Sequence, residues 1–179
     1  MKENWTVIAV SGVTCGGKSS LVKAMKDKFP HAIVIHQDDY FFLESDPRHT
    51  KVVSLNCLNW EIMSSIDMDK LRKDVEDILK RSCNSKMLIL DGFLVLNDEY
   101  LSKICKKKLY FILSEEECRK RRVARVYIPP DVPGYFDKIV WPEFLKSKDE
   151  ALKLNPDLQL IDGSRSTESI LTELLQTLD

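Results

Sequence analysis

Apolar residues follow two alternating patterns along the chain. Short, mostly apolar runs, each followed by polar residues or glycine, occupy residues 6–10, 32–36, 87–90, 109–113 and 158–161. Amphipathic stretches, with apolar side chains three and four positions apart, occupy residues 19–29, 67–79 and 167–178. The first pattern is typical of strands buried on both faces, and the second of helices that cover a sheet. The chain is therefore predicted to have an α/β fold, with a parallel sheet and helices on both of its faces.

The residues that follow the predicted strands indicate where a ligand would bind. Gly12, Asp38, Asp91, Ser114 and Gly163 stand at or just after the strand ends. The carboxyl ends of parallel strands meet at one rim of the sheet, and ligands of open α/β sheets bind there. We therefore expect the functional site at this rim.

A phosphate-binding motif follows the first predicted strand. The sequence GVTCGGKS, from Gly12 to Ser19, matches G-x-x-x-x-G-K-[ST] and lies between a predicted strand and a predicted helix. In this motif the backbone amides hold phosphates, the lysine reaches the β- and γ-phosphates, and the hydroxyl binds Mg²⁺. A chance glycine-rich turn is the alternative, but the flanking strand and helix favour nucleotide binding. Lys18 is thus a candidate catalytic residue and Ser19 a candidate metal ligand.

Two further strand ends carry carboxylates. Asp38 and Asp39 follow the second predicted strand, where a kinase needs a base that accepts the proton of an acceptor hydroxyl. Asp38 is the candidate for this role, and capping of the next turn is the alternative. Asp91 ends the third strand and has the form of a Walker-B acid that holds Mg²⁺ directly or through water. A simple turn at Asp91 and Gly92 is the competing interpretation.

A basic helix follows the fourth predicted strand. Ser114 and Glu117 match a capping box that opens it, and five of residues 119–125 are Lys or Arg. Such a run is often a solvated face or a nucleic-acid patch. If the helix closes over a nucleotide instead, its arginines neutralise charge on the transferred phosphoryl group and exclude water. A proline-rich loop, residues 128–134, comes next.

Composition and charge narrow the class of protein. The 179 residues are 44% hydrophobic and carry 27 basic and 28 acidic side chains, a net charge of −1 that argues against a general polyanion binder. The five cysteines include no C-x-x-C pair, so neither a disulfide framework nor a zinc ribbon is indicated. The sequence contains no apolar run long enough to span a membrane and no signal-peptide pattern. We expect one cytoplasmic domain, residues 1–179.

Two aromatic positions complete the candidate site. Trp60 stands beside Glu61, and Tyr127 precedes the proline-rich loop. An aromatic ring next to a carboxylate can stack on a flat, cationic ring while the carboxylate binds sugar hydroxyls. Burial of either aromatic in the core is the alternative.

Several motifs together resemble the nicotinamide riboside kinase family. They are GVTCGGKS at residues 12–19, HQDDYF at 36–41, LDGF at 90–93, CRKRR at 118–122, RVY at 125–127, PPDVPGYFD at 129–137 and VWP at 140–142. The resemblance runs from residue 6 to about residue 167. It implies a P-loop kinase fold with a five-stranded parallel core and an arginine-rich lid, about residues 115–137. It also implies Mg²⁺-dependent transfer of the ATP γ-phosphate to the ribose 5′-hydroxyl of nicotinamide riboside, and of nicotinate riboside, in NAD salvage.

The resemblance further assigns roles residue by residue, with Asp38 as general base. The implied ATP-binding residues are Gly12, Val13, Thr14, Cys15, Gly16, Gly17, Lys18, Ser19, Ser20, Arg121, Arg125, Val126, Tyr127, Arg165, Ser166 and Thr167. The implied substrate-binding residues are Asp38, Asp39, Tyr40, Phe41, Trp60, Glu61, Arg122, Tyr127 and Ile128, and the implied metal ligands are Ser19, Asp38 and Asp91. The chain departs from the family where Trp60 and Glu61 replace the usual Tyr-Asp and Asp91 replaces the usual Glu.

Other functions remain open at the level of sequence. A uridine or cytidine kinase would share the loop, the base and the lid, but would read a pyrimidine edge by hydrogen bonds. A GTPase-type switch would carry an N-K-x-D motif, which the sequence lacks. A nucleic-acid-binding ATPase would combine residues 119–125 with several stacking aromatics. We expect small-molecule partners, ATP and a pyridine nucleoside, and a monomer that binds neither nucleic acid nor membrane.

Overall fold

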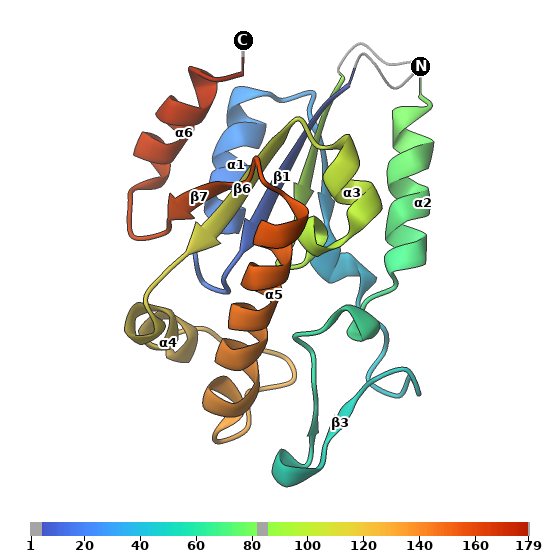
Figure 1. Cartoon of the computed structure of the whole chain (residues 1–179), viewed down its shortest axis with the longest axis vertical. Helices are drawn as coiled ribbons and strands as arrows, with labels where there is room; N and C mark the ends of the chain where they lie inside the picture. The colour runs from blue at the N-terminus through green and yellow to red at the C-terminus, as the bar shows by residue number, and fades with distance from the viewer. Residues whose placement is uncertain (1–4, 82–85, 179) are drawn as a thin grey trace.

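Five parallel strands form the central sheet of the computed structural model, in the order β2-β5-β1-β6-β7 (Figure 1). Their bounds are Thr6–Gly12 for β1, Ile33–His36 for β2, Met87–Asp91 for β5, Lys107–Ile112 for β6 and Gln159–Asp162 for β7. The predicted parallel sheet is confirmed, and each strand begins and ends within two residues of its expected position. The structure describes residues 5–81 and 86–178, so residues 1–4 and Cys83, which enter the sequence arguments, lie outside it.

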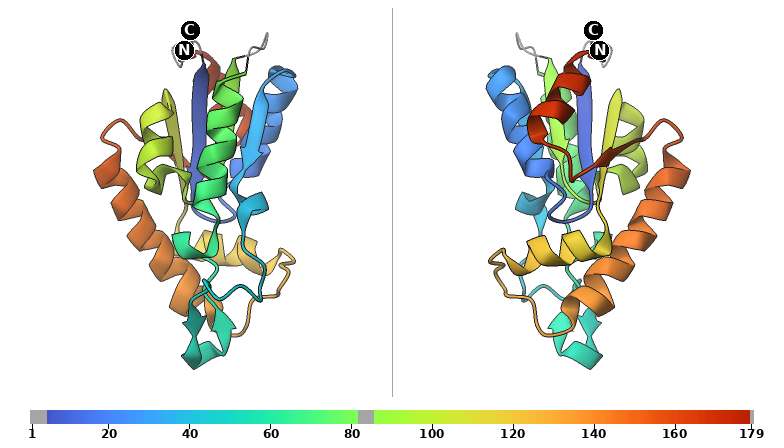
Figure 2. Two further views of the ribbon diagram at one scale, coloured as in Figure 1. Left: turned by 90° about the vertical axis from the view of Figure 1, so that its right-hand side faces the viewer. Right: turned by 90° about the vertical axis from the view of Figure 1, so that its left-hand side faces the viewer.

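Helices cover both faces of the sheet, as predicted (Figure 2). One face carries α1 (Lys18–Lys28) and α6 (Thr167–Leu175), and the other carries α2 (Met68–Leu79), α3 (Glu99–Ile104) and α5 (Trp141–Leu154). Alternate residues of β1 divide between the two layers. Ile8 and Val10 pack with α1 and α6, whereas Val7 and Ala9 pack with the helices of the opposite face. Burial on both sides explains why the strands are continuous apolar runs.

The strand register brings the polar strand ends to one rim. His36 of β2 is the register partner of Asp91 of β5, and Gly12 of β1 is the register partner of Phe111 of β6. A 3₁₀ turn, Gln37–Tyr40, continues directly from β2 at the same rim. The predicted convergence of the phosphate loop with two strand-end carboxylates is therefore confirmed.

The basic helix α4 (Glu115–Val123) lies across this end of the sheet (Figure 2). The predicted cap is confirmed, because Ser114 Oγ accepts a hydrogen bond from the Glu117 amide at 3.2 Å. The helix ends at Val123, so Arg125 lies beyond it and the expectation that the helix extends over residue 125 is wrong. Ala124, the C-terminal cap, marks the change from helix to the proline-rich loop.

Several elements were not predicted from the sequence. The 14-residue helix α5 continues directly from a π-helical segment, Phe136–Val140, and has Pro142 near its start. Its buried residues are Phe144, Ser147 and Ala151, a stripe too sparse to stand out. Helix α3 has six residues, and the strands β3 (Lys51–Val52) and β4 (Cys57–Leu58) have two each, below the length at which periodicity is visible. None of the helices in the described part of the chain has the length and apolar character needed to cross a bilayer.

Candidate active site

The phosphate loop forms the turn between β1 and α1. Gly12 has φ of 109° and Gly17 has φ of 100°, in the left-handed region that glycine adopts without strain. A Cβ on Gly12 would lie 2.2 Å from the carbonyl oxygen of Phe111. The backbone path of the loop therefore favours glycine at positions 12 and 17.

The side chain of Lys18 folds back into this loop. Its Nζ donates hydrogen bonds to the carbonyl oxygens of Gly12 at 3.0 Å and Val13 at 2.8 Å. Burial lowers the pKa of Lys18, whereas the negative charges of Asp91 and Asp38 act in the opposite direction. The loop therefore holds a cation beside two carboxylates, at the position where the motif predicts contact with phosphate.

Asp38 follows β2, and its side chain lines the cleft together with Lys18. Asp38 is exposed to solvent at the cleft, and partial desolvation by the surrounding protein raises the pKa of its carboxyl, while the charge of Lys18 opposes this shift. A raised pKa makes a carboxylate a stronger acceptor for a proton. The environment of Asp38 thus suits the general base that the sequence predicts.

The candidate metal ligands lie at the ends of β5 and α1. Ser19 Oγ donates to Asp91 Oδ2 across 3.5 Å, a long contact, and His36 Nδ1 lies 2.9 Å from the same carboxylate oxygen. Hydroxyl and carboxylate oxygens are the ligand types that Mg²⁺ prefers. No group of three or more His, Cys, Asp or Glu side chains suited to a metal ion occurs among the described residues. The residues present therefore fit a Mg²⁺ ion that takes most of its ligands from nucleotide and water.

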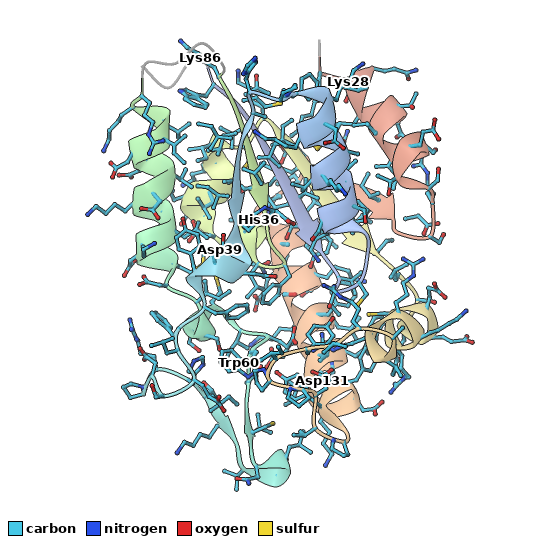
Figure 3. All side chains as sticks on the ribbon, turned by 180° about the vertical axis from the view of Figure 1, so that it is seen from behind. Lys28, His36, Asp39, Trp60, Lys86 and Asp131 are labelled. Carbon is cyan, nitrogen blue, oxygen red and sulfur yellow. The ribbon has the colours of Figure 1, made fainter. Side chains whose placement is uncertain are left out.

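A cleft of about 620 Å³ joins these groups to the basic helix and the proline-rich loop. Figure 3 shows Trp60 and Asp131 on facing segments beyond the end of β2, where His36 and Asp39 are labelled. The candidate residues that line the cleft are Thr14, Cys15, Lys18, Ser19, Asp38, Phe41, Trp60, Glu61, Asp91, Arg122, Arg125, Tyr127 and Ile128. The structure thus brings most of the predicted catalytic, metal and substrate residues into one cavity.

Arg122 is the centre of a buried ionic network in this cleft. Its guanidinium binds Asp131 through Nε at 2.6 Å and Nη2 at 3.0 Å, Glu61 through Nη2 at 3.1 Å, and Thr14 Oγ1 through Nη1 at 3.2 Å. The Arg122 side chain is 6% exposed and the Glu61 side chain 14% exposed. Burial raises the pKa of Glu61, and the charge of Arg122 opposes this effect. The network connects the phosphate loop, α4, the proline-rich loop and the Trp60-Glu61 pair.

Trp60 and Tyr127 both line the cleft, but each already has protein partners. The Trp60 ring packs against His49, with centroids 4.4 Å apart, and edge-on to Phe41 at 5.7 Å. The Tyr127 hydroxyl lies 3.3 Å from Thr14 Oγ1, and the guanidinium of Arg122 lies 4.4 Å from the Tyr127 ring centroid. Stacking of a substrate ring between Trp60 and Tyr127 stays a prediction.

Other predicted residues lie away from the cleft lining. Neither Asp39 nor Tyr40 lines the cleft, and the Tyr40 hydroxyl donates a hydrogen bond to Asp74 at 2.8 Å. Val126 is 91% exposed. Arg165 pairs with Glu173 at 2.7 Å along α6. Their contacts with substrate or ATP stay predictions.

The remaining nucleotide-side candidates surround the phosphate loop. Arg121 donates to the carbonyl oxygens of Gly163 at 2.9 Å and Cys15 at 3.3 Å, which joins α4 to the residue after β7 and to the phosphate loop. Ser166 caps α6 by accepting a hydrogen bond from the Ser169 amide, and Thr167 begins that helix. Ser20 is an exposed residue of the first turn of α1.

His36 and Asp131 are among the cleft residues that the sequence analysis did not identify as site residues. His36 is the last residue of β2 and contacts Asp91, because the two strands are in register. Asp131 lies in the proline-rich loop, where aspartate is a common turn residue and its local sequence gives no sign of an ionic role. The signal that could have found Asp131 is its place in the same motif as Tyr127.

The chain is similar to two mammalian kinases over nearly its full length. It is 33% identical over 182 residues to nicotinamide riboside kinase 1 of Mus musculus, which covers 95% of this chain and 92% of that protein. It is 32% identical over 184 residues to nicotinamide riboside kinase 1 of Homo sapiens, with 96% and 91% covered. No family model matches the chain.

Solved structures of P-loop kinases share the fold. Shikimate kinase from Acinetobacter baumannii has a TM-score of 0.58 at 11% identity, with 98% of this chain and 94% of that chain covered. Thymidylate kinase from Candida albicans has a TM-score of 0.59 at 16% identity, with 97% and 91% covered. These structures support the fold alone, whereas the full-length similarity to the mammalian kinases identifies the family. This chain belongs to the nicotinamide riboside kinase family.

Proposed function

We propose that this protein transfers the γ-phosphoryl group of ATP to the ribose 5′-hydroxyl of nicotinamide riboside, giving nicotinamide mononucleotide and ADP. The observation that carries this proposal is the single cleft in which Lys18 and Asp38 face Glu61, Arg122 and Trp60. Membership of the family supplies the substrate class. The reaction would be a salvage step in NAD biosynthesis, and nicotinate riboside is a second expected substrate.

The phosphate loop would bind the β- and γ-phosphates of ATP. Lys18 would exchange its hydrogen bonds to Gly12 and Val13 for phosphate oxygens. Ser19 and Asp91 are the residues suited to hold Mg²⁺, with Asp38 nearby. When bound, Mg²⁺ would neutralise charge on the β- and γ-phosphates.

Asp38 would act as the general base. The 5′-hydroxyl proton would pass to the Asp38 carboxylate as the hydroxyl oxygen bonds to the γ-phosphorus, and the bond to the β,γ-bridging oxygen would break to release ADP. The raised pKa of Asp38 supports this role, because a carboxylate with a higher pKa is a stronger base.

Recognition of the nucleoside would fall to the opposite end of the cleft. The carboxylate of Glu61 and the guanidinium of Arg122, held 3.1 Å apart, are suited to bind the ribose hydroxyls. Trp60 and Tyr127 would stack on the nicotinamide ring, whose positive charge favours aromatic faces. A pyrimidine kinase would need hydrogen-bonding groups for a base edge instead.

The basic helix and the loop that follows would form the lid. Arg121 and Arg125 flank the phosphate loop, where Arg121 donates to the Cys15 carbonyl and an Arg125 nitrogen lies 4.0 Å from Cys15 Sγ. Closure over ATP would bring their charges to the phosphates and exclude water. Arg165, Ser166 and Thr167 would border the adenine.

We expect a monomer that acts on small molecules and binds neither nucleic acid nor membrane. The net charge of −1 offers no long-range field for nucleic acid. We expect the protein to act in the cytoplasm, on a diffusible nucleoside.

A nucleoside panel tests the proposed function. The purified protein is incubated with ATP, Mg²⁺ and one of nicotinamide riboside, nicotinate riboside, uridine or cytidine, and kcat/KM is measured for each. We expect the highest kcat/KM with a pyridine riboside. A higher value for uridine or cytidine would reject the proposed substrate class in favour of a pyrimidine nucleoside kinase.

A further inference from the structure

His36 and Asp91 form an ion-pair contact between neighbouring strands. They are register partners in the parallel pairing of β2 with β5, so their side chains leave the sheet on the same side. His36 Nδ1 lies 2.9 Å from Asp91 Oδ2, and a carboxylate oxygen can only accept, so Nδ1 carries the proton. The Asp91 side chain is 7% exposed, whereas His36 is 49% exposed and lines the cleft.

Asp91 has few other groups to fix its orientation. Ser19 Oγ lies 3.5 Å from the oxygen that His36 contacts, at the limit of a hydrogen bond. The aspartate side chain carries its carboxylate on a single methylene group, so it reaches only a short way beyond the strand end. A fixed direction therefore matters for its contact with the nucleotide's metal ion.

We propose that His36 is a positioning residue for phosphoryl transfer, which holds the Asp91 carboxylate toward the site of the Mg²⁺–nucleotide complex. The His36 ring occupies Oδ2 and leaves Oδ1 of Asp91 as the acceptor for that complex. This inference rests on the proposed kinase function, but it concerns the nucleotide half of the site and is independent of which nucleoside is phosphorylated.

Its test is the Mg²⁺ dependence of ADP binding, measured by isothermal titration calorimetry without any nucleoside present. The dissociation constant for ADP is determined with saturating Mg²⁺ and again with a chelator, for the unmodified protein and for His36→Ala. Loss of a group that orients a metal-binding carboxylate costs about 10- to 100-fold in metal affinity. We expect His36→Ala to weaken Mg²⁺·ADP binding by about 10-fold and leave metal-free ADP binding unchanged.

Two rescue variants and one control sharpen the test. His36→Asn keeps an N–H near the position of Nδ1 and is expected to retain most of the Mg²⁺ effect. In the double variant His36→Ala with Asp91→Glu, the longer side chain extends the carboxylate beyond the strand end without His36, and binding should recover to within about threefold of the unmodified protein. His31→Ala removes an exposed histidine outside the cleft and should change nothing.

Three results would overturn the proposal. They are unchanged Mg²⁺·ADP affinity in His36→Ala, an equal loss of affinity with and without Mg²⁺, and failure of Asp91→Glu to restore the loss. Because no nucleoside is present, an error in the proposed substrate would leave each of these readouts unaffected.

Discussion

Arg122 and Asp131 are joined by two parallel hydrogen bonds, from Nε to Oδ2 at 2.6 Å and from Nη2 to Oδ1 at 3.0 Å. This fork-to-fork geometry is specific to arginine, because lysine presents a single ammonium group. The pair fixes the basic helix to the proline-rich loop beside Glu61. The arginine in this charge run that matters most for the cleft is therefore the buried one, while Arg119 pairs with Glu115 and Asp137 at the surface.

Arg122→Lys should reduce kcat/KM for the nucleoside while the fold is retained. Lysine keeps the charge but loses at least one charge-assisted hydrogen bond, which costs about 1.5–3 kcal/mol, or about 10- to 100-fold in kcat/KM. Steady-state kinetics measure the loss, and Arg119→Lys on the same helix is the matched control. An unchanged kcat/KM in Arg122→Lys would mean that the positive charge is enough and that the forked hydrogen bonds are not needed.

Asp38→Asn should lower kcat by at least about 100-fold, the lower end of the range for a lost general base, with little change in ATP binding. Asp39→Asn is the matched control, since the adjacent carboxyl does not line the cleft. Single-turnover kinetics separate the chemical step from binding. A large loss from Asp39→Asn with a nearly silent Asp38→Asn would reassign the base.

The raised pKa of Asp38 predicts two pH effects of defined sign. The base must be ionised, so activity should fall as pH decreases, beginning at a higher pH than an ordinary aspartate would give. For stability, a raised folded-state pKa means that the folded protein favours the protonated carboxyl. That stabilisation is complete below the unfolded pKa and is lost as pH rises through the folded value.

Thermal unfolding of Asp38→Asn checks this sign. The variant carries no titrating group at position 38, so its melting temperature should exceed that of the unmodified protein at neutral pH. The difference should shrink as the pH is lowered past the Asp38 pKa. A variant less stable at neutral pH, with a difference that grows on acidification, would contradict the assigned direction.

Trp60→Leu should lower kcat/KM more for a charged nucleoside than for a neutral one. A desolvated cation–π contact contributes about 2 kcal/mol, so kcat/KM for nicotinamide riboside should fall by roughly 30-fold, with a smaller loss for uridine. Trp60→Tyr, which restores the residue usual in the family, should be nearly neutral. Because Trp60 also packs against His49 and Phe41, equal losses for both nucleosides would indicate that it shapes the cleft and does not recognise the cation.

The sequence predicts the sheet and its rim well, for a physical reason. Strands buried on both faces are continuous apolar runs, and the residues after parallel strands meet at one rim, so the positions of Gly12, Asp38 and Asp91 follow from local pattern alone. The phosphate loop is equally local, since its glycines meet a backbone requirement at Gly12 and Gly17.

The parts that escaped prediction depend on packing between distant segments. The His36 contact with Asp91 requires the register of β2 against β5, and the Asp131 contact with Arg122 requires a loop to return across α4. Neither contact joins residues of one helix or one strand, so the periodicity of the sequence does not predict it. Helix α5 buries only Phe144, Ser147 and Ala151, so its sequence shows no continuous apolar stripe that would predict a helix.

The identity of the phosphorylated product tests the central claim most directly. The protein is incubated with nicotinamide riboside, ATP and Mg²⁺, and the products are identified by chromatography with mass spectrometry and phosphorus NMR. Lys18→Ala, which keeps the loop but removes the phosphate-binding amine, is the blank, and Lys23→Ala on the exposed face of α1 is its control. We predict nicotinamide mononucleotide, phosphorylated at the 5′ position, formed in equal amount with ADP by the unmodified protein and by Lys23→Ala and nearly abolished in Lys18→Ala. ATP consumption without this product, or product formation that persists in a folded Lys18→Ala variant, would contradict the account.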